Sequence, residues 1–305
     1  MIKHKSVLLD EAIELLNVKE DGIYIDGTLG RGGHTKEILK RLKNGKLYCF
    51  DLDEEAIKES KELLKDYKNV IYIHDNYMNM NKYVEKVDGI LLDLGVSSPQ
   101  FDEAERGFSY RNDGPLDMRM DKDNPLTAEE IINTYSEEDL IRIFKDYGEE
   151  RNAKSIAKAI VHRRVQCPIR TTLELVEVIK EGLPHKALSK KGHPAKQVFQ
   201  SLRIAVNHEL DSLSNFLNDF NQILNRDGRV VVISFHSLED RLVKKCFKKL
   251  SSVEDDLRIN KLPSEIETPD YELVTRHAVV PSDKEIEDNP RSKSAKLRAI
   301  KKVKD

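Results

Sequence analysis

Four short apolar segments alternate with helix-forming segments in the first hundred residues, and this alternation constrains the fold more than any other feature. The apolar segments have the length and composition of buried strands, and they cover residues 22–26, 46–51, 70–74 and 88–93. Amphipathic helix patterns lie between them, at 34–42, 54–64 and 79–87. Strands and helices that alternate in this way predict a parallel sheet with helices on both faces.

Three of these predicted strands end in an aspartate. Asp26, Asp51 and Asp93 occupy the last positions of the first, second and fourth strands. In a parallel sheet the carboxyl ends of the strands meet at one edge, which is where open α/β sheets bind ligands. The sequence therefore predicts a ligand site with several carboxylates at this edge.

The strand pattern stops near residue 105 and returns at 228–235. Helix starts with capping-box spacing occur between them at Thr127, Ser136 and Thr171, and an apolar pattern after residue 194 predicts one long helix leading back to the sheet. We therefore expect a discontinuous α/β domain, residues 1–105 and 201–305, and an inserted all-helical domain, residues 106–200. Residues 271–279 and 296–303 are expected to supply the last strands, with a loop over 257–269.

Composition excludes several classes of protein. The three cysteines, Cys49, Cys167 and Cys246, form no CxxC pair, so we expect cytoplasmic thiols and no disulfide. The chain contains no apolar run near 18 residues, and Asp10 and Glu11 interrupt the apolar N-terminal stretch. Neither a signal peptide nor a membrane span is expected.

The net charge of −3 conceals segments of opposite sign. Residues 101–150 carry 15 acids against 6 Lys and Arg, whereas residues 151–203 carry 12 Lys and Arg against 3 acids. The last stretch, 291–305, has 7 basic residues and one acid. A single charge run is usually a solvated helix face, but two basic segments favour a nucleic-acid partner.

A glycine-rich segment, Asp26-Gly-Thr-Leu-Gly-Arg-Gly-Gly-His34, follows the first predicted strand and opens a helix. Asp51 lies 19 residues after Gly32, the spacing of an acid that binds ribose hydroxyls. The dinucleotide pattern G-x-G-x-x-G fails at Thr35, and no triphosphate-binding loop is present. Because an acid precedes the glycines, a cationic cofactor is favoured, and S-adenosylmethionine fits.

Six motifs together resemble the small-subunit ribosomal RNA cytosine-N4 methyltransferases. They stand in order along the whole chain, at residues 4–11, 26–34, 91–100, 113–121, 234–240 and 289–298. The resemblance implies a class I methyltransferase, whose Rossmann-like, mostly parallel sheet has seven strands, with an inserted helical domain for substrate recognition. It also implies S-adenosylmethionine as methyl donor and a cytidine in the decoding region of 16S ribosomal RNA as target.

The resemblance also implies roles for individual residues. Cofactor contacts fall on Gly32, Gly33, His34, Asp51, Tyr77, Asp93 and Gln100. Asp93 is the expected essential carboxylate, and Ser97, Ser98 and Pro99 are expected to shape the target pocket. Amino-methylating enzymes of the wider superfamily often have an acid or amide followed by Pro-Pro and an aromatic residue, and this chain departs from that pattern. The departure leaves open whether Asp93 holds the target amine, the cofactor or both.

His236 is a further catalytic candidate, because it follows the strand predicted at 228–235. Ser237 and Asp240 have capping-box spacing, which predicts that Ser237 caps the helix after this strand. His236, Glu239 and Asp240 lack a matching His or Cys cluster elsewhere, so no metal site is expected.

Aromatic and basic residues provide candidates for RNA contacts. Phe108 and Tyr110 either stack on an extruded base or pack in the core. Phosphate contacts, which position RNA without reading its sequence, are expected from Arg163, Arg164, Lys190, Lys191, Lys196, Arg291, Lys293, Lys296 and Arg298.

Several functions compete with methylation of the small-subunit RNA. The main alternative is an S-adenosylmethionine-dependent methyltransferase that acts on another RNA, a protein or a small molecule. A nicotinamide-dependent dehydrogenase conflicts with Thr35, and a non-enzymatic RNA-binding module predicts that Asp93 is dispensable. The oligomeric state is left open, a homodimer included.

Overall fold

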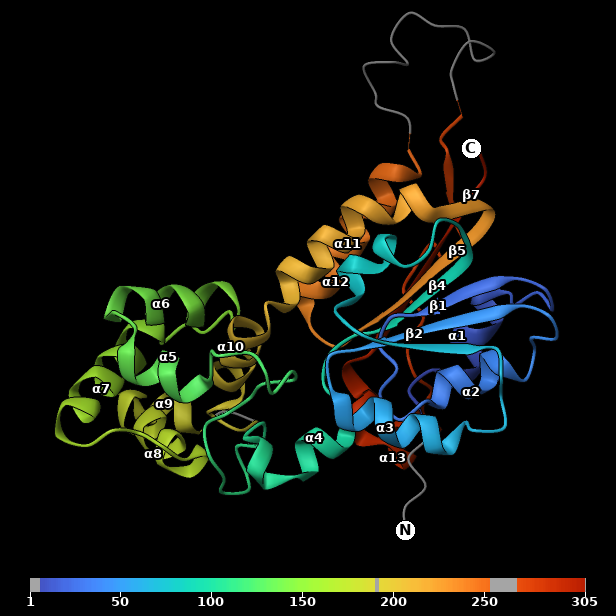
Figure 1. Cartoon of the computed structure of the whole chain (residues 1–305). Coiled ribbons are helices and arrows are strands. Elements are labelled where there is room, and N and C mark those ends of the chain that lie inside the picture. Colours follow the sequence, from blue (N-terminus) through green and yellow to red (C-terminus); the bar gives the residue numbers. More distant parts are fainter. Residues whose placement is uncertain (1–5, 190–191, 253–267, 305) are drawn as a thin grey trace, which may run out of the picture. The chain divides into compact units, whose positions relative to one another are not determined.

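The computed structural model describes residues 6–189, 192–252 and 268–304, and the chain forms two compact units (Figure 1). One consists of residues 1–95 and 210–305, and the other of residues 96–209. The helical unit extends beyond the expected limits of 106 and 200. Val96 and Phe101 on one side, and Leu202 and Val206 on the other, pack in or against its apolar core.

The first unit is built on a seven-stranded sheet with the strand order β3-β2-β1-β4-β5-β7-β6. The strands are β1 (Ile23–Asp26), β2 (Lys46–Asp51), β3 (Val70–His74), β4 (Val87–Asp93), β5 (Leu224–Ser234), β6 (Tyr271–Leu273) and β7 (Lys296–Lys302). The first five strands pair in parallel, whereas β7 runs antiparallel to both β5 and β6. This sheet confirms the predicted Rossmann-like α/β class.

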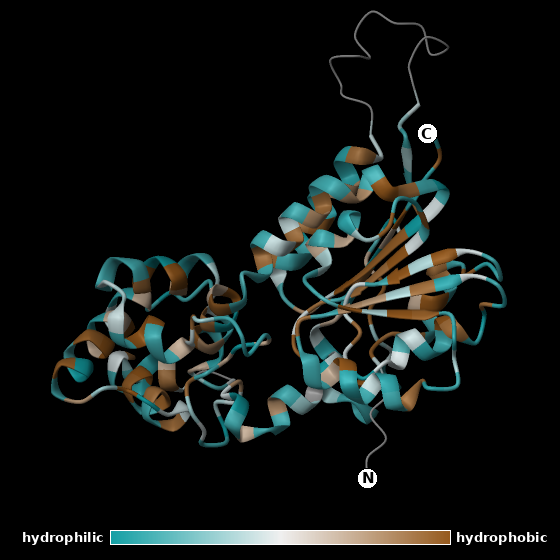
Figure 2. Ribbon diagram, viewed as in Figure 1, coloured by the Kyte–Doolittle hydropathy of each residue, from teal (hydrophilic) through white to brown (hydrophobic). Residues whose placement is uncertain are grey.

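Apolar clusters cover both faces of the sheet, whose central strands are mostly hydrophobic (Figure 2). One cluster includes side chains of α11 and α12, and the other includes side chains of α1, α2 and α3. The helices of this unit are α1 (Leu9–Leu16), α2 (Gly33–Leu39), α3 (Glu54–Leu63), α11 (Glu209–Ile223), α12 (Ser237–Leu250) and α13 (Asp283–Asp288). Two 3-10 helices, η1 (Tyr77–Lys82) and η5 (Pro290–Ser294), complete it.

The second unit is helical and has its own buried core. Its helices are α4 (Ser98–Asp102), α5 (Ala128–Thr134), α6 (Glu137–Asp146), α7 (Ala153–Gln166), α8 (Thr172–Gly182), α9 (His185–Leu188) and α10 (Lys196–Asn207), with the 3-10 turn η2 (Ala104–Arg106). Side chains of Thr127, Ser136 and Thr171 cap α5, α6 and α8 as predicted. No helix in the described ranges combines the length and apolarity needed to cross a bilayer.

Two local predictions are wrong, and one short helix was not predicted. The long helix predicted after residue 194 is two helices, α10 and α11, because His208 between them adopts a left-handed conformation with φ of 50°. Residues 79–87 form the end of η1 and the start of β4 rather than an α-helix. The sequence also gives no sign of α4, which is only five residues long. Most of the loop predicted at 257–269 lies outside the described residues.

Candidate cofactor and active site

Two threonines, Thr28 and Thr35, hold the loop after β1 in place by hydrogen bonds to Asp26 and Asp93 at the sheet edge. Asp26 is almost fully buried, and its carboxylate accepts a hydrogen bond of 2.6 Å from the Thr35 hydroxyl and one of 3.2 Å from the Thr28 amide. The Thr28 hydroxyl in turn accepts a hydrogen bond of 2.6 Å from the Asp93 amide. Thr35, where the dinucleotide pattern fails, thus has a structural role as the partner of Asp26.

Gly30 and Gly32 turn this loop toward β2. Both have positive φ, 49° and 71°, which non-glycine residues rarely adopt. The Gly30 amide donates a hydrogen bond of 2.7 Å to Asp51, and a Cβ added at Gly30 would meet only the Thr28 carbonyl oxygen, at 4.0 Å. The other Asp51 oxygen accepts a hydrogen bond of 2.9 Å from the Asp53 amide. The loop therefore leaves room beside Asp51 for a ligand.

Gly33 and His34 begin α2, with Gly32 as the residue before its first turn. His34 is 5% exposed, and its Nε2 lies 3.1 Å from the Val7 carbonyl oxygen. Burial lowers the pKa of His34 to about 4, so the ring is neutral near pH 7. A carbonyl can only accept, so Nε2 carries the proton and the lone pair of Nδ1 faces Asp93 Oδ2 at 3.7 Å.

Asp93, the last residue of β4, has an unsatisfied oxygen. Its Oδ1 is buried and has no hydrogen-bond partner among the residues that the structure describes. Burial raises the pKa of Asp93 well above its usual value, and the charges of Asp26 and Glu239 raise it further. A buried acceptor without a partner costs about 1–3 kcal/mol, so this site is built to receive a donor from a ligand.

Carboxylates concentrate at this edge without a matching cation among their hydrogen-bond partners. Burial raises the pKa of Asp26 to about 6 and that of Asp51 to about 6, in both cases against the effect of hydrogen bonds. A ligand with positive charge stabilises the ionised forms of such groups. The positive sulfonium and ammonium groups of S-adenosylmethionine are chemically suited to these carboxylates. In such a complex Asp51 would bind the ribose hydroxyls, and the Gly30 turn would allow close backbone approach.

Tyr77 follows β3 and begins η1, as the sequence suggested for an adenine contact. Its ring packs edge-on against Phe216 of α11, with 5.9 Å between centroids, and remains partly exposed. A Cβ on Gly27 would lie 3.0 Å from the Tyr77 Cβ. Glycine at 27 therefore lets Tyr77 pack closely against the loop that follows β1.

The prediction that Ser237 caps the helix after β5 is wrong. His236 occupies that position, its side chain accepting a hydrogen bond from the Glu239 amide at the start of α12. Glu239 Oε2 accepts a hydrogen bond of 2.8 Å from the Phe235 amide, while Oε1 lies 3.0 Å from His236 Nε2. Both nitrogens of His236 therefore face Glu239, so the ring is better suited to shape the site than to remove a proton.

Ser97, Ser98, Pro99 and Gln100 belong to α4 in the helical unit. Gln100 is buried, and its side-chain oxygen accepts a hydrogen bond of 3.0 Å from the Ser97 amide as half of a capping box, with Pro99 in the first turn. These local contacts give the motif a structural role at the start of α4. The roles assigned to these residues in binding cofactor and target remain predictions.

Two expected phosphate contacts of the first unit are engaged within the fold. Arg298 Nε lies 2.7 Å from Asp240 Oδ1, and the Arg298 side chain is 13% exposed. Lys296 Nζ lies 3.0 Å from the other oxygen of Asp240. Asp240 therefore forms ion pairs with both cations and joins α12 to β7, whereas Arg291 and Lys293 on η5 remain exposed.

In the helical unit, Arg163 forms an ion pair with Glu181 at 2.5 Å. Arg164 donates hydrogen bonds of 2.7 Å to the Ile132 and Tyr135 carbonyl oxygens, which terminates α5. Arg164 is thus a structural residue rather than a phosphate contact. Lys190 and Lys191 lie outside the described residues, and Lys196 is exposed.

Replacing Arg164 with methionine is expected to lower the free energy of unfolding by about 1–3 kcal/mol, because two carbonyl groups lose their partner. Chemical denaturation followed by circular dichroism measures this change. Affinity for RNA is expected to stay within twofold of the wild type. A variant of normal stability with weakened RNA binding would instead support Arg164 as a phosphate contact.

The aromatic candidates divide between core and surface. Phe108 is 3% exposed and packs in the core of the helical unit, so its stacking on a base is excluded in this fold. Tyr110 is partly exposed, but one face is stacked on His193 with 4.3 Å between ring centroids. A base that stacks here meets a pair of rings rather than a single tyrosine.

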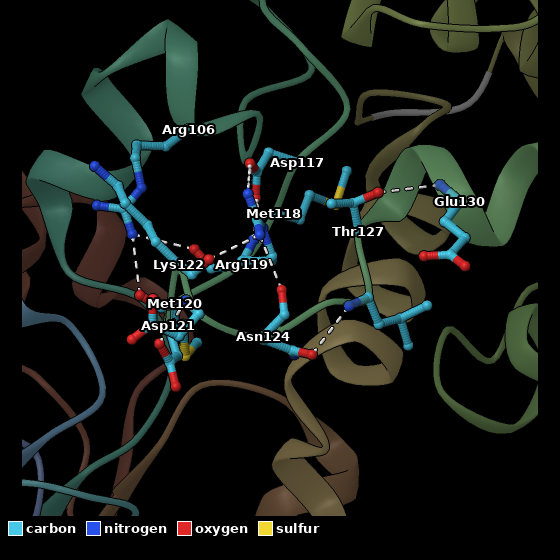
Figure 3. Close-up of polar contacts among 12 residues, drawn as sticks. Arg106, Asp117, Met118, Arg119, Met120, Asp121, Lys122, Asn124, Thr127 and Glu130 are labelled. Carbon is cyan, nitrogen blue, oxygen red and sulfur yellow. Dashed lines mark hydrogen bonds and ion pairs between the residues drawn. The ribbon is translucent and has the colours of Figure 1, made fainter.

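The motif at 113–121 builds a rigid loop from its own charges (Figure 3). Arg119 binds both oxygens of Asp117, each at 2.8 Å. Arg106 donates to the Arg119 and Met120 carbonyl oxygens at 3.1 and 3.2 Å. Met118 is fully buried with a positive φ of 61°, a strained conformation that these bonds and Asn207, which donates to its carbonyl oxygen, hold in place. Arg106 and Arg119 are therefore framework residues.

The strand order of the sheet and the glycine-rich loop after β1, with its neighbouring carboxylates, together define a class I S-adenosylmethionine-dependent methyltransferase. The model of the MraW methylase family matches residues 1–303, and the chain belongs to this family. A ribosomal RNA small subunit methyltransferase H from Clostridium botulinum is 51% identical, over 99% of both chains. Another of that name from Spiroplasma kunkelii is 53% identical, again over 99% of both.

Solved structures are similar at lower identity. An rRNA methylase from Streptococcus thermophilus is 14% identical with a TM-score of 0.39, over 97% of this chain and 93% of that chain. A likeness this distant carries no weight in the assignment. The family membership rests on the matched family model and on the curated relatives.

The sequence interpretation missed three residues that organise the site. Thr28 links the glycine loop to β4, Thr35 binds Asp26, and Glu239 holds His236. Glu239 was detectable in principle, because His236 and Glu239 have the same three-residue spacing as Ser237 and Asp240. Histidine is not among the preferred capping residues, so the sequence favoured Ser237 and Asp240 over His236 and Glu239.

Proposed function

We propose that this protein transfers the methyl group of S-adenosylmethionine to the exocyclic N4 amine of a cytidine in the decoding region of 16S ribosomal RNA. The names of the curated relatives support methylation of small-subunit ribosomal RNA. The observation that carries the proposal at this site is the buried, unpartnered Oδ1 of Asp93 at the carboxyl end of β4. An amino group with two hydrogens supplies the donor that this oxygen lacks.

Methyl transfer to this amine depends on orientation and on exclusion of water. When bound, the cofactor supplies an electrophilic methyl group, and sulfur keeps the electron pair as the C–S bond breaks. The N4 lone pair is delocalised into the cytosine ring. A hydrogen bond from the amine to Asp93 Oδ1 holds N4 in line with the methyl group and increases the electron density on nitrogen.

Asp93 is also placed to take the proton that N4 loses after the C–N bond forms. Burial and the charges of Asp26 and Glu239 raise the pKa of Asp93, which makes its carboxylate a stronger base than an exposed aspartate. His34 is neutral and presents the lone pair of Nδ1 toward Asp93, so it does not neutralise the carboxylate as a cation would.

A duplex or stacked base hides N4, so the target nucleotide has to leave its stack to reach Asp93. We assign recognition of the surrounding RNA to the inserted helical segment, residues 106–200 as predicted from the sequence. Ribosomal RNA as substrate places the activity in the cytoplasm.

Nucleoside mass spectrometry of small-subunit RNA from cells that lack the protein tests this function. N4-methylcytidine is expected to disappear, to return with the wild-type chain and to stay absent with Asp93→Ala. An unchanged level in the deletion strain contradicts the proposal. Loss of a methylated nucleoside from another RNA, with the 16S RNA unchanged, favours the alternative methyltransferase.

A further inference from the structure

Helix α12 carries a continuous row of basic side chains that the segment charges did not reveal. Its members, which we call the α12 basic stripe, are Arg241, Lys244, Lys245, Lys248 and Lys249. The spacing of three and four residues places neighbouring members of the row on the same face of the helix. All five residues are exposed.

No acid interrupts the stripe. The two acids of α12, Glu239 and Asp240, are 2% and 8% exposed. Glu239 binds backbone amides and faces His236, while Asp240 pairs with Arg298 and Lys296. Helix α3 provides a contrast, because its two lysines, Lys58 and Lys61, alternate along the chain with the four glutamates Glu54, Glu55, Glu59 and Glu62.

The fold does not neutralise the lysines of the stripe. Within the described ranges, no ion pair involves Lys244, Lys245, Lys248 or Lys249. The helix dipole favours cations only in the last turn, which accounts for Lys248 and Lys249 but not for Lys244. Like charges four residues apart on a helix destabilise it. An anionic partner outside the fold offsets this cost.

The stripe starts close to the catalytic edge. Helix α12 begins directly after β5 with His236 as its cap, and Glu239 in its first turn is near enough to raise the pKa of Asp93. From Arg241 to Lys249 the helix rises by about 12 Å. This length spans several phosphates of a nucleic-acid strand.

We propose that the α12 basic stripe binds the phosphate backbone of the RNA beside the nucleotide that enters the active site. The inference rests on the proposed function, since it takes RNA as the substrate. Phosphates match a row of lysines without need for sequence recognition. The stripe thus positions the substrate strand, while the Asp93 edge carries out the chemistry.

The test compares two triple variants with the same charge change. K244Q/K245Q/K248Q removes three cations of the stripe. K58Q/K61Q/K65Q removes three exposed cations, two from α3 and one from the turn just after it, in a segment where acids alternate with lysines. K244R/K245R/K248R keeps the charge on the stripe. Binding of a fluorescent 20-nucleotide single-stranded RNA is measured between about 50 and 300 mM KCl, a range over which phosphate contacts dominate the salt dependence.

For the stripe variant, the negative slope of log affinity against log salt is expected to be about 2 less steep than for the wild type. This value follows from about 0.7 per phosphate contact on a single strand. Its KM for small ribosomal subunits is expected to rise roughly tenfold with kcat unchanged, because phosphate contacts position the substrate. Cofactor affinity by calorimetry is expected to stay unchanged. The α3 variant and the arginine variant are expected to resemble the wild type.

A stripe variant that binds RNA like the wild type overturns the inference, and so does an α3 variant with an equal loss, because both results make the position of the charges irrelevant. Either result leaves the proposed function intact if the wild type methylates small-subunit RNA. A wild-type protein that neither binds nor methylates this RNA overturns the inference and the proposed function together.

Discussion

Replacement of Asp93 by asparagine is expected to lower kcat for methyl transfer by a factor on the order of 10²–10⁴, the range attributed to a positioned proton acceptor. The amide has the same shape, but half of it donates hydrogen bonds and it cannot take a proton. An amine that meets a donor in place of Oδ1 loses its orientation. Methyl transfer from radiolabelled cofactor to small ribosomal subunits measures the change.

The stability of this variant distinguishes catalysis from folding. Asp93 is costly to the unliganded protein, because burial raises its pKa and its Oδ1 has no partner. Asp93→Asn is therefore expected to leave the melting temperature unchanged or to raise it. Asp88→Asn is the control on the same strand: Asp88 accepts a hydrogen bond of 2.9 Å from the Ile23 amide near the start of β4. Full activity in Asp93→Asn, or loss of activity in both variants, would falsify the assignment.

The sheet was predictable because its signals are local. β2 and β3 have the predicted limits, and β1 and β4 differ by one residue at their starts. Each is a short apolar run that ends at a polar residue, so burial and strand length can be seen in the sequence itself. The aspartates at the sheet edge follow from the same pattern, and their raised pKa values follow from the burial of that edge.

The wrong predictions depend on partners that are distant in the sequence. The break between α10 and α11 at His208 is accompanied by a hydrogen bond from Asn207 to the Met118 carbonyl, 89 residues away. The sequence suggested that Arg298 contacts a phosphate, but in the structure Asp240, 58 residues earlier, lies beside it. Arg164 likewise depends on carbonyl groups of α5. The charge and helix propensity of a short stretch of sequence cannot reveal contacts between residues that are distant along the chain.

The α12 basic stripe was missed for a different reason. The segments whose charge was summed, 101–150, 151–203 and 291–305, do not include α12, although the three- and four-residue spacing of its lysines was visible in the sequence. What the sequence did not show is that both acids of this helix turn inward. Which charges remain for a partner is therefore a property of the fold.

Replacement of Asp51 by alanine is expected to weaken cofactor binding by roughly ten- to a hundredfold, since a hydrogen bond to a charged group contributes about 1.5–3 kcal/mol. Asp51 holds the Gly30 turn and faces the space that this turn leaves open. Affinity for RNA is expected to change less than twofold. Calorimetry with the cofactor and the RNA titration above measure the two effects, and equal losses would show that Asp51 acts on the whole fold. Asp21→Ala, which alters an exposed acid bonded to Asn44, is the control.

The pH dependence of cofactor binding gives an independent test of the same group. Burial raises the pKa of Asp51 and of Asp26 to about 6, so both carboxylates gain protons as the pH falls through that value. A cationic cofactor prefers the ionised carboxylates, so affinity is expected to fall below pH 6 and binding near pH 6 to release protons. Calorimetry in buffers of different ionisation enthalpy measures this release.

The unliganded protein is expected to show the opposite trend in stability. Because these pKa values are raised, the folded state binds more protons than the unfolded chain between about pH 4 and 6. The contribution of Asp26 and Asp51 to stability is therefore complete at about pH 4 and is lost as the pH rises through 6. Asp51→Asn removes one of these two contributions, so its free energy of unfolding should vary less over this range. A wild-type protein whose cofactor affinity is constant from pH 5 to pH 7 contradicts the electrostatic account of the site.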